Sequence, residues 1–167
     1  EGLYFRLNSA HAGANATGAQ NLLPANVTVA GSTVYEYEIF YRLLKTAGTT
    51  SHNVSISWGG TATLNNWHRQ MVTTSNNAAD FNNVIGAIGA DASQATPINI
   101  SGTINFADAR VIAHERGTFS VNAGGTLIPQ YALSAAPGGA YSTAAGALFR
   151  LRKLGVSGAN NSQGLWA

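Results

Sequence analysis

The sequence predicts an all-β protein that folds as an antiparallel β-sandwich, jelly-roll-like, of about eight or nine strands. Three observations lead to this fold class. Apolar and polar side chains alternate along most of the chain, clusters of Gly, Pro, Asn, Asp and Ser interrupt the alternation, and no segment has the pattern of a long, capped amphipathic helix. The chain has 167 residues, which is about the length of one domain, so we expect residues 1–167 to form a single sandwich.

The first strands are predicted where the alternation is clearest. Residues 3–8 alternate at the start of the chain, and residues 33–45 form the most regular segment. In that segment five apolar side chains share one face: Tyr35, Tyr37, Ile39, Tyr41 and Leu43. In residues 51–58 the shared face holds His52, Val54, Ile56 and Trp58. Trp58 is therefore expected in the core.

The remaining strands are predicted at residues 61–72, 97–106, 110–122, 126–134 and 147–154. Turn clusters separate them, among them GAIGADAS at residues 86–93. Residues 77–90, NAADFNNVIGAIGA, are the one segment that could form a short helix, although its glycines disfavour it. Pro129 removes one ladder donor from its strand, so we expect its nitrogen to face an edge or a bulge.

A short internal repeat links two parts of the chain. VSISWGGTATL, from Val54, aligns with FSVNAGGTLIP, from Phe119, and this places the two Gly-Gly-Thr triplets over each other. Gly-Gly supplies the positive φ angles of tight two-residue turns, so the repeat predicts two related hairpins, one in each half of a double Greek key. The alternative is that Gly-Gly-Thr is simply a common turn sequence.

The composition limits the classes of function. Charged residues make up 10% of the chain, against roughly 25% in typical soluble domains, and glycine contributes 19 residues. A chain so poor in charge either packs against copies of itself or is made soluble by hydroxyls and amides. Basic residues are scattered and the net charge is +2, which does not indicate nucleic-acid binding. The absence of cysteine excludes disulfides and thiolate metal sites. No apolar run approaches the roughly 18 residues that membrane insertion requires.

No convincing catalytic set is present, so we expect a protein that is not an enzyme and has neither a cofactor nor a metal site. Glu36 and Glu38 share a strand face with their carboxylates roughly 7 Å apart, which could suit a glycosidase but is more typical of a solvated face. The four histidines lack metal-binding spacing: His11, His52, His68 and His114.

Aromatic side chains offer a binding alternative. Five of them could stack on sugar rings: Trp58, Trp67, Tyr131, Tyr141 and Trp166. Trp67 lies in the polar segment NNWHRQ, so it is the best candidate for an exposed contact. The candidate ligand-contact residues are Trp67, His68, Arg69 and Tyr141.

Three blocks of sequence resemble a known family. They are YFRLNSAHAGANATGAQNLL from Tyr4, GSTVYEYEIFYRL continuing to TAGTTSHNVSISWGGTATL from Gly31, and GTFSVNAGGTLIPQYALSAAPGGAYSTAAGALFRLRKLG from Gly117. The chain resembles a domain common in bacteriophage virion structural proteins, especially of marine and environmental phages, which tends to occur at the C-terminal end of tail-fibre-like proteins. The resemblance covers nearly the whole chain and is weakest at residues 76–108. Its motifs are structural and carry no catalytic residues.

The resemblance implies a non-enzymatic β-sandwich domain that forms a homotrimer on the phage particle surface, head or tail appendage, together with other virion proteins. Residues 124–139, GGTLIPQYALSAAPGG, have no charge and many small side chains, which permit backbones of sister copies to approach closely. The expected trimer-interface residues are Tyr131, Arg150 and Arg152. A tail-fibre or appendage domain that contacts the host surface is the first hypothesis, with a host cell-surface glycan as a candidate ligand. A capsid decoration protein, a free carbohydrate-binding module and a small glycosidase are the alternatives.

Overall fold

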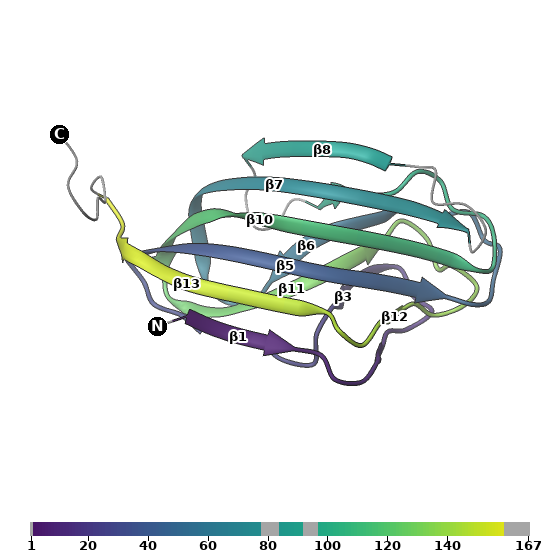
Figure 1. Ribbon diagram of the computed structural model, residues 1–167, viewed down its shortest axis with the longest axis horizontal. Helices are drawn as coiled ribbons and strands as arrows, with labels where there is room; N and C mark the ends of the chain where they lie inside the picture. The colour runs from purple at the N-terminus through teal and green to yellow at the C-terminus, as the bar shows by residue number, and fades with distance from the viewer. Residues whose placement is uncertain (1, 78–83, 92–96, 159–167) are drawn as a thin grey trace.

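The computed structural model describes residues 2–77, 84–91 and 97–158, and it contains two antiparallel sheets packed face to face (Figure 1). The described residues contain no helix, which confirms the all-β prediction. None of them therefore forms a helix long and apolar enough to cross a membrane.

The larger sheet is built from long strands. Its order is β1-β13-β5-β10-β7-β8, which corresponds to Gly2–Arg6, Leu148–Val156, Thr33–Lys45, Ala109–Ala123, Thr63–Asn77 and Val84–Asp91. Two short strands extend it: β12 (Ser142–Thr143) pairs with the end of β5, and β2 (His11–Ala12) pairs with β12. In the smaller sheet the order is β3-β11-β6-β9, which corresponds to Gly18–Asn21, Gly125–Leu133, Val54–Gly59 and Ile98–Asn99. β4 (Val27–Val29) pairs with the beginning of β11.

The connections between the sheets are those of a jelly roll. The eight strands β1, β3, β5, β6, β9, β10, β11 and β13 can be renumbered 1 to 8 in chain order. The larger sheet then contains 1-8-3-6 and the smaller sheet 2-7-4-5, so that most connections cross from one sheet to the other. The hairpin of β7 and β8 is inserted between β6 and β9 and widens the larger sheet (Figure 1).

The core lies between the sheets and follows the predicted alternation. β5 has the predicted bounds, and its five alternate apolar side chains, Tyr35 to Leu43, are all buried. Trp58, also buried as predicted, packs edge-on against Tyr37 with ring centroids 5.4 Å apart. Aromatic pairs of this kind contribute about 0.5–1.5 kcal/mol beyond the area they bury.

The Gly-Gly-Thr repeat does not form two hairpins. Each copy connects a strand of one sheet to a strand of the other, β6 to β7 and β10 to β11. The two crossovers instead bind each other: the N–H groups of Thr61 and Ala62 both donate to the Thr126 carbonyl at 3.0 Å, and the Thr126 N–H donates to Thr61 Oγ1 at 3.0 Å. Only Gly60 in the two glycine pairs has a positive φ, of 111°. Gly60 and Gly125 are needed because the two crossovers lie so close together: a Cβ there would lie 2.1 Å from the Thr126 carbonyl oxygen or 2.5 Å from Thr61 Oγ1.

Two other predicted elements are wrong. Residues 84–91, part of the candidate helix and of the predicted turn at residues 86–93, form β8, because β7 offers an edge with which they pair, with one irregularity between Val72 and Thr74 of β7. The predicted strand at residues 97–106 is reduced to β9 and an isolated bridge between His52 and Ile104. The chain bends between them, where Asn99 Oδ1 accepts a hydrogen bond from the Ser101 N–H at 3.2 Å.

Pro129 lies in β11, a central strand of the smaller sheet, opposite the gap between the two short strands that pair with one side of β11. β4 pairs with residues up to Leu127, and β3 pairs with residues from Gln130 onward. The Pro129 carbonyl accepts from the Leu22 N–H on this same side at 2.9 Å, so the proline nitrogen faces the gap between β4 and β3. The missing donor therefore costs no ladder hydrogen bond.

We expect Gly60→Ala to destabilise the fold strongly. An alanine Cβ there would lie 2.1 Å from the Thr126 carbonyl oxygen, in addition to the cost of the positive φ. Gly146→Ala is the matched control, because φ is 92° but nothing lies within 4 Å of the added Cβ. The left-handed backbone alone should cost about 1–2 kcal/mol, and the collision should add about 1–3 kcal/mol of overpacking. Urea denaturation of both variants measures the difference, and equal losses would contradict the packing of the crossovers.

Candidate interaction surface

The outer face of the larger sheet carries the candidate site. Side chains that alternate with the buried core residues point outward from β1, β13, β5, β10 and β7, and the strand register aligns them in rows across the sheet. One row contains Tyr4, Arg150, Glu38, Arg116 and Gln70. The next row contains Gly2, Arg152, Glu36, Thr118 and His68.

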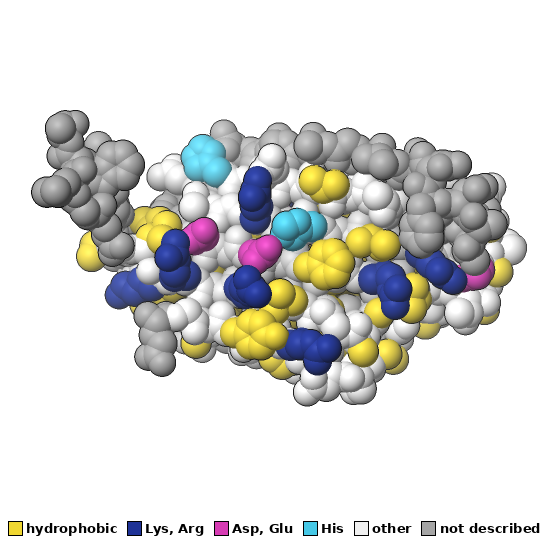
Figure 2. Space-filling model, in the orientation of Figure 1, with side chains coloured by type: hydrophobic (Ala, Val, Ile, Leu, Met, Phe, Trp, Pro, Cys, Tyr) yellow, Lys and Arg dark blue, Asp and Glu magenta, His cyan; other side chains and the backbone are white. Residues whose placement is uncertain are grey.

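Arginine predominates among the charged groups of this face (Figure 2). The outward positions of the five strands hold six arginines, namely Arg6, Arg42, Arg110, Arg116, Arg150 and Arg152. Only two carboxylates accompany them, Glu36 and Glu38. The described outward side chains of these strands therefore have an excess of four positive charges. None of the strands of the smaller sheet contains a charged residue.

Both glutamates are paired with arginines of β13. Arg152 Nε donates to Glu36 Oε2 at 2.9 Å, and Arg150 Nη1 donates to Glu38 Oε2 at 3.3 Å. His114 Nε2 lies 2.8 Å from Glu38 Oε1. Exposed ion pairs of this kind contribute only about 0–1 kcal/mol to stability. Folding alone therefore gives little reason to collect these charges on one face.

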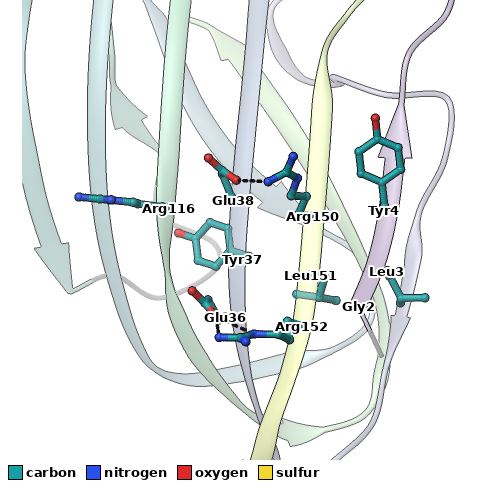
Figure 3. A pocket seen from close by; sticks show the side chains of 10 residues that line it. All are labelled: Gly2, Leu3, Tyr4, Glu36, Tyr37, Glu38, Arg116, Arg150, Leu151 and Arg152. Atoms are coloured by element: carbon teal, nitrogen blue, oxygen red, sulfur yellow. Dashed lines mark hydrogen bonds and ion pairs between the residues drawn. The ribbon is translucent and has the colours of Figure 1, made fainter.

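A shallow groove of about 470 Å³ crosses this face from β1 to β10 (Figure 3). Tyr4 lies at one side, Arg116 at the other, and the two Glu–Arg pairs lie between them (Figure 3). A second depression of about 360 Å³ lies beyond Arg116 and is lined by His68, Gln70 and Thr118. Arg116 lines both, so its side chain is reachable from either side.

The groove does not have the features of a glycosidase site. Glu36 and Glu38 are each held by an arginine, and their side chains are 48% and 35% exposed. Among the residues that the structure describes, no three His, Asp or Glu side chains gather to hold a metal ion.

Trp67 and Arg69, predicted as exposed ligand contacts, lie in the core instead. Trp67 is 2% exposed, and its Nε1 donates to the Tyr37 hydroxyl at 2.9 Å. Arg69 lies over the Trp67 ring and donates from Nε to Glu115 Oε1 at 2.7 Å. The sequence did not reveal this because Trp67, Arg69 and Met71 form a mixed strand face, and the ion-pair partner of Arg69 lies on another strand.

Glu115 is the centre of this buried network, which lies directly beneath the outer face. It is fully buried, and its Oε1 also accepts a hydrogen bond from the Tyr37 hydroxyl at 2.6 Å. Burial and the negative charge of Glu115 raise the pKa of Tyr37 well above its usual value. Burial alone would lower the pKa of Arg69, but the carboxylate of Glu115 raises it. Tyr37 therefore stays neutral and Arg69 stays positively charged.

Tyr141 and Tyr131 are also buried, at 1% exposure each. The Tyr141 hydroxyl lies 2.9 Å from His52 Nε2, and Tyr131 donates to Gln20 Oε1 at 2.9 Å. Burial raises the pKa of Tyr131 to about 12 and lowers the pKa of His52. The predictions of Tyr141 as a ligand contact and of Tyr131 as an interface residue are therefore wrong, because both rings complete the core of the single chain.

The other predicted site residues remain accessible. His68 is exposed, and the side chains of Arg150 and Arg152 are 59% and 65% exposed, so their roles stay predictions. Trp166 lies outside the described residues. Sequence analysis missed Tyr4, which is 61% exposed, although its alternation with Phe5 in β1 was the available signal.

Comparison with known proteins adds little. No protein-family model matches the chain, and no curated protein is significantly similar to it. Among solved structures, that of infectious bursal disease virus Gx strain is similar over 92% of this chain and 39% of that chain, with 4% identity and a TM-score of 0.21. This chain thus spans well under half of the chain it matches. A TM-score this low carries no argument about fold or function.

We expect Glu115→Gln to lower the free energy of unfolding by about 3–5 kcal/mol, because it leaves the buried guanidinium of Arg69 without a counter-charge. Glu38→Gln is the matched control on the outer face and should cost at most about 1 kcal/mol. Urea denaturation at neutral pH measures both. Similar losses for the two variants would show that the buried pair has no special role.

Proposed function

We propose that this chain is a non-catalytic structural domain of a bacteriophage particle, a trimeric tail-fibre or appendage domain that contacts the host surface. The observation that carries the proposal is the contrast between the outer faces of the two sheets, one rich in arginine and one without charge. The resemblance to virion domains and the jelly-roll topology, which viral capsid proteins and lectins also use, support it. The fold alone would not, because one fold serves many functions.

The uncharged face suits contact between copies. One row across the smaller sheet consists of Ala19, Ala132, Ser55 and Asn99. Side chains this short let the backbones of neighbouring subunits approach closely. The arginine-rich face would instead place positive charge against positive charge if copies met there. We therefore assign the trimer contact to the smaller sheet, in place of Arg150 and Arg152.

Labelling of particles tests the location. Antibody fragments raised against the chain should bind to tail fibres or other appendages of the phage that encodes it, as seen by negative-stain electron microscopy. Even labelling of the head would replace the appendage role with capsid decoration. Absence of label from intact and from disrupted particles would exclude a virion role and favour a free binding module.

Light scattering tests the assembly. The unaltered chain should have three times the mass of one subunit, and Ala132→Arg should reduce it to a monomer, because a long charged side chain cannot fit in a close contact between small residues. Thr118→Arg is the control, since it adds the same side chain to the outer face of the larger sheet. A monomeric unaltered chain, or a trimer broken by Thr118→Arg alone, would contradict the proposed arrangement.

A further inference from the structure

We propose that the groove across β1, β13, β5 and β10 binds an acidic oligosaccharide, one that carries uronate carboxylates. In this site Arg116 binds a sugar carboxylate and Tyr4 stacks on a sugar ring. The inference rests on the proposed function and names the class of host-surface ligand that this face would recognise.

The charged side chains of the groove are unequally paired. Three arginines and two glutamates line the groove. Arg150 and Arg152 are paired with the two glutamates, whereas Arg116 donates only to an amide oxygen, that of Gln70, at 2.9 Å. This bond uses Nε, so the two Nη groups of Arg116 have no partner among the described residues. A guanidinium binds carboxylates through two parallel N–H groups, and a carboxylate of the ligand would complete the pairing.

Tyr4 places an exposed aromatic ring at the other side of the groove. Tyr4 pairs with Arg150 in the strand register, and it is 61% exposed, whereas the three tyrosines of β5 are buried. A tyrosine offers a flat apolar face and a polar hydroxyl, which suits the apolar face and the hydroxyl groups of a pyranose ring. Three strand spacings separate Tyr4 from Arg116, roughly 14 Å. The ligand that reaches both is therefore an oligosaccharide rather than a single sugar.

Glu36 and Glu38 lie between Tyr4 and Arg116, and their carboxylates can bind the uncharged hydroxyl groups of the ligand. Arg152 donates to Glu36 Oε2 from both Nε and Nη2, which leaves Oε1 able to accept a hydrogen bond from a sugar hydroxyl. Paired acidic and basic groups bind hydroxyls well, since the carboxylate accepts and the guanidinium donates. The same two glutamates would repel a ligand with a negative charge on every unit.

The geometry of the groove also favours a sugar over other classes of ligand. The groove runs across the strands, from the edge strand β1 to β10, so a peptide that lies along it cannot pair with a sheet edge as an added strand does. A second copy of this chain would bring its own excess of arginine to the contact. A short acidic peptide that binds through its carboxylates alone is the remaining competitor, and the experiment includes it.

The test is isothermal titration of the full chain with a hyaluronan tetrasaccharide, in which uronates alternate with neutral sugars, and with maltotetraose as a neutral ligand of matched length. We expect binding of the uronate and much weaker binding of the neutral sugar. Arg116→Gln and Tyr4→Ala should each lower the affinity for the uronate by about tenfold or more, the effect of losing a charge-assisted hydrogen bond or a stacked ring.

Two matched controls lie on the same face outside the groove lining. Arg110→Gln removes a cation from the same strand as Arg116, and Phe40→Ala removes an aromatic ring that is 45% exposed. Each should change the affinity less than about twofold. If Arg110→Gln weakened binding as much as Arg116→Gln, the attraction would be a general effect of the positive face and the site would be refuted. Equal binding of the neutral sugar, or of a tetra-aspartate peptide, would also overturn the assignment.

The experiments can refute the groove assignment and the proposed function independently of each other. Labelled appendages on the particle together with no uronate binding would refute the groove alone. Uronate binding that depends on Arg116 and Tyr4, with no label on particles, would refute the virion role and leave the groove as the site of a free carbohydrate-binding module.

Discussion

The pairing of β5 with β10 at the centre of the larger sheet is the constraint on which the rest of the structure depends. Its register runs without a break from Thr33 opposite Val121 to Lys45 opposite Ala109. In this register every inward side chain of β5 reaches the core, while Glu36 and Glu38 reach the outer face. A slip of one residue would exchange the two faces, burying the glutamates and exposing the tyrosines.

The buried network of Glu115, Arg69, Tyr37 and Trp67 reinforces this register. Its members come from β10, β7 and β5, and only the observed alignment brings Arg69 and Glu115 together. Gly117 contributes as well, because it lies opposite Tyr37, where a Cβ would come within 3.0 Å of the ring. Buried ion pairs add little net stability, since desolvation offsets their attraction. Any other alignment would leave two uncompensated charges in the core, so the network disfavours alternatives more than it stabilises the native state.

The same alternation gives the two sheets different outer faces, one without charged strand residues and one rich in arginine. The smaller sheet has no charged side chain on any strand, and short side chains cover the middle of its outer face. The larger sheet collects the arginines, and among the described residues Arg116, unlike Arg150 and Arg152, has no carboxylate partner. A low overall charge is therefore compatible with a strongly charged local surface. The few charges of this chain are concentrated on one face, where they produce a local electrostatic field.

The sequence alone determined the strands and most of the core. Alternation is a local property, so β5 was predicted to the residue, and Trp58 was correctly assigned to the interior. It could not determine which strands are neighbours. The Gly-Gly-Thr repeat was visible, but whether it made hairpins or crossovers depended on the sheet that each flanking strand joins. Residues 84–91 became a strand only because β7 offered an edge to pair with.

The site shows the same division. The sequence placed Glu36, Glu38, Arg150 and Arg152 on polar strand faces, but it could not align them with Arg116 and Tyr4 in one groove. It assigned Trp67 and Arg69 to the surface, since an arginine flanked by polar residues is usually exposed and the carboxylate that permits its burial lies on a different strand. Local patterns thus decided which residues form strands and which faces are apolar. Tertiary structure decided which charges meet, because their partners are close in space and distant along the chain.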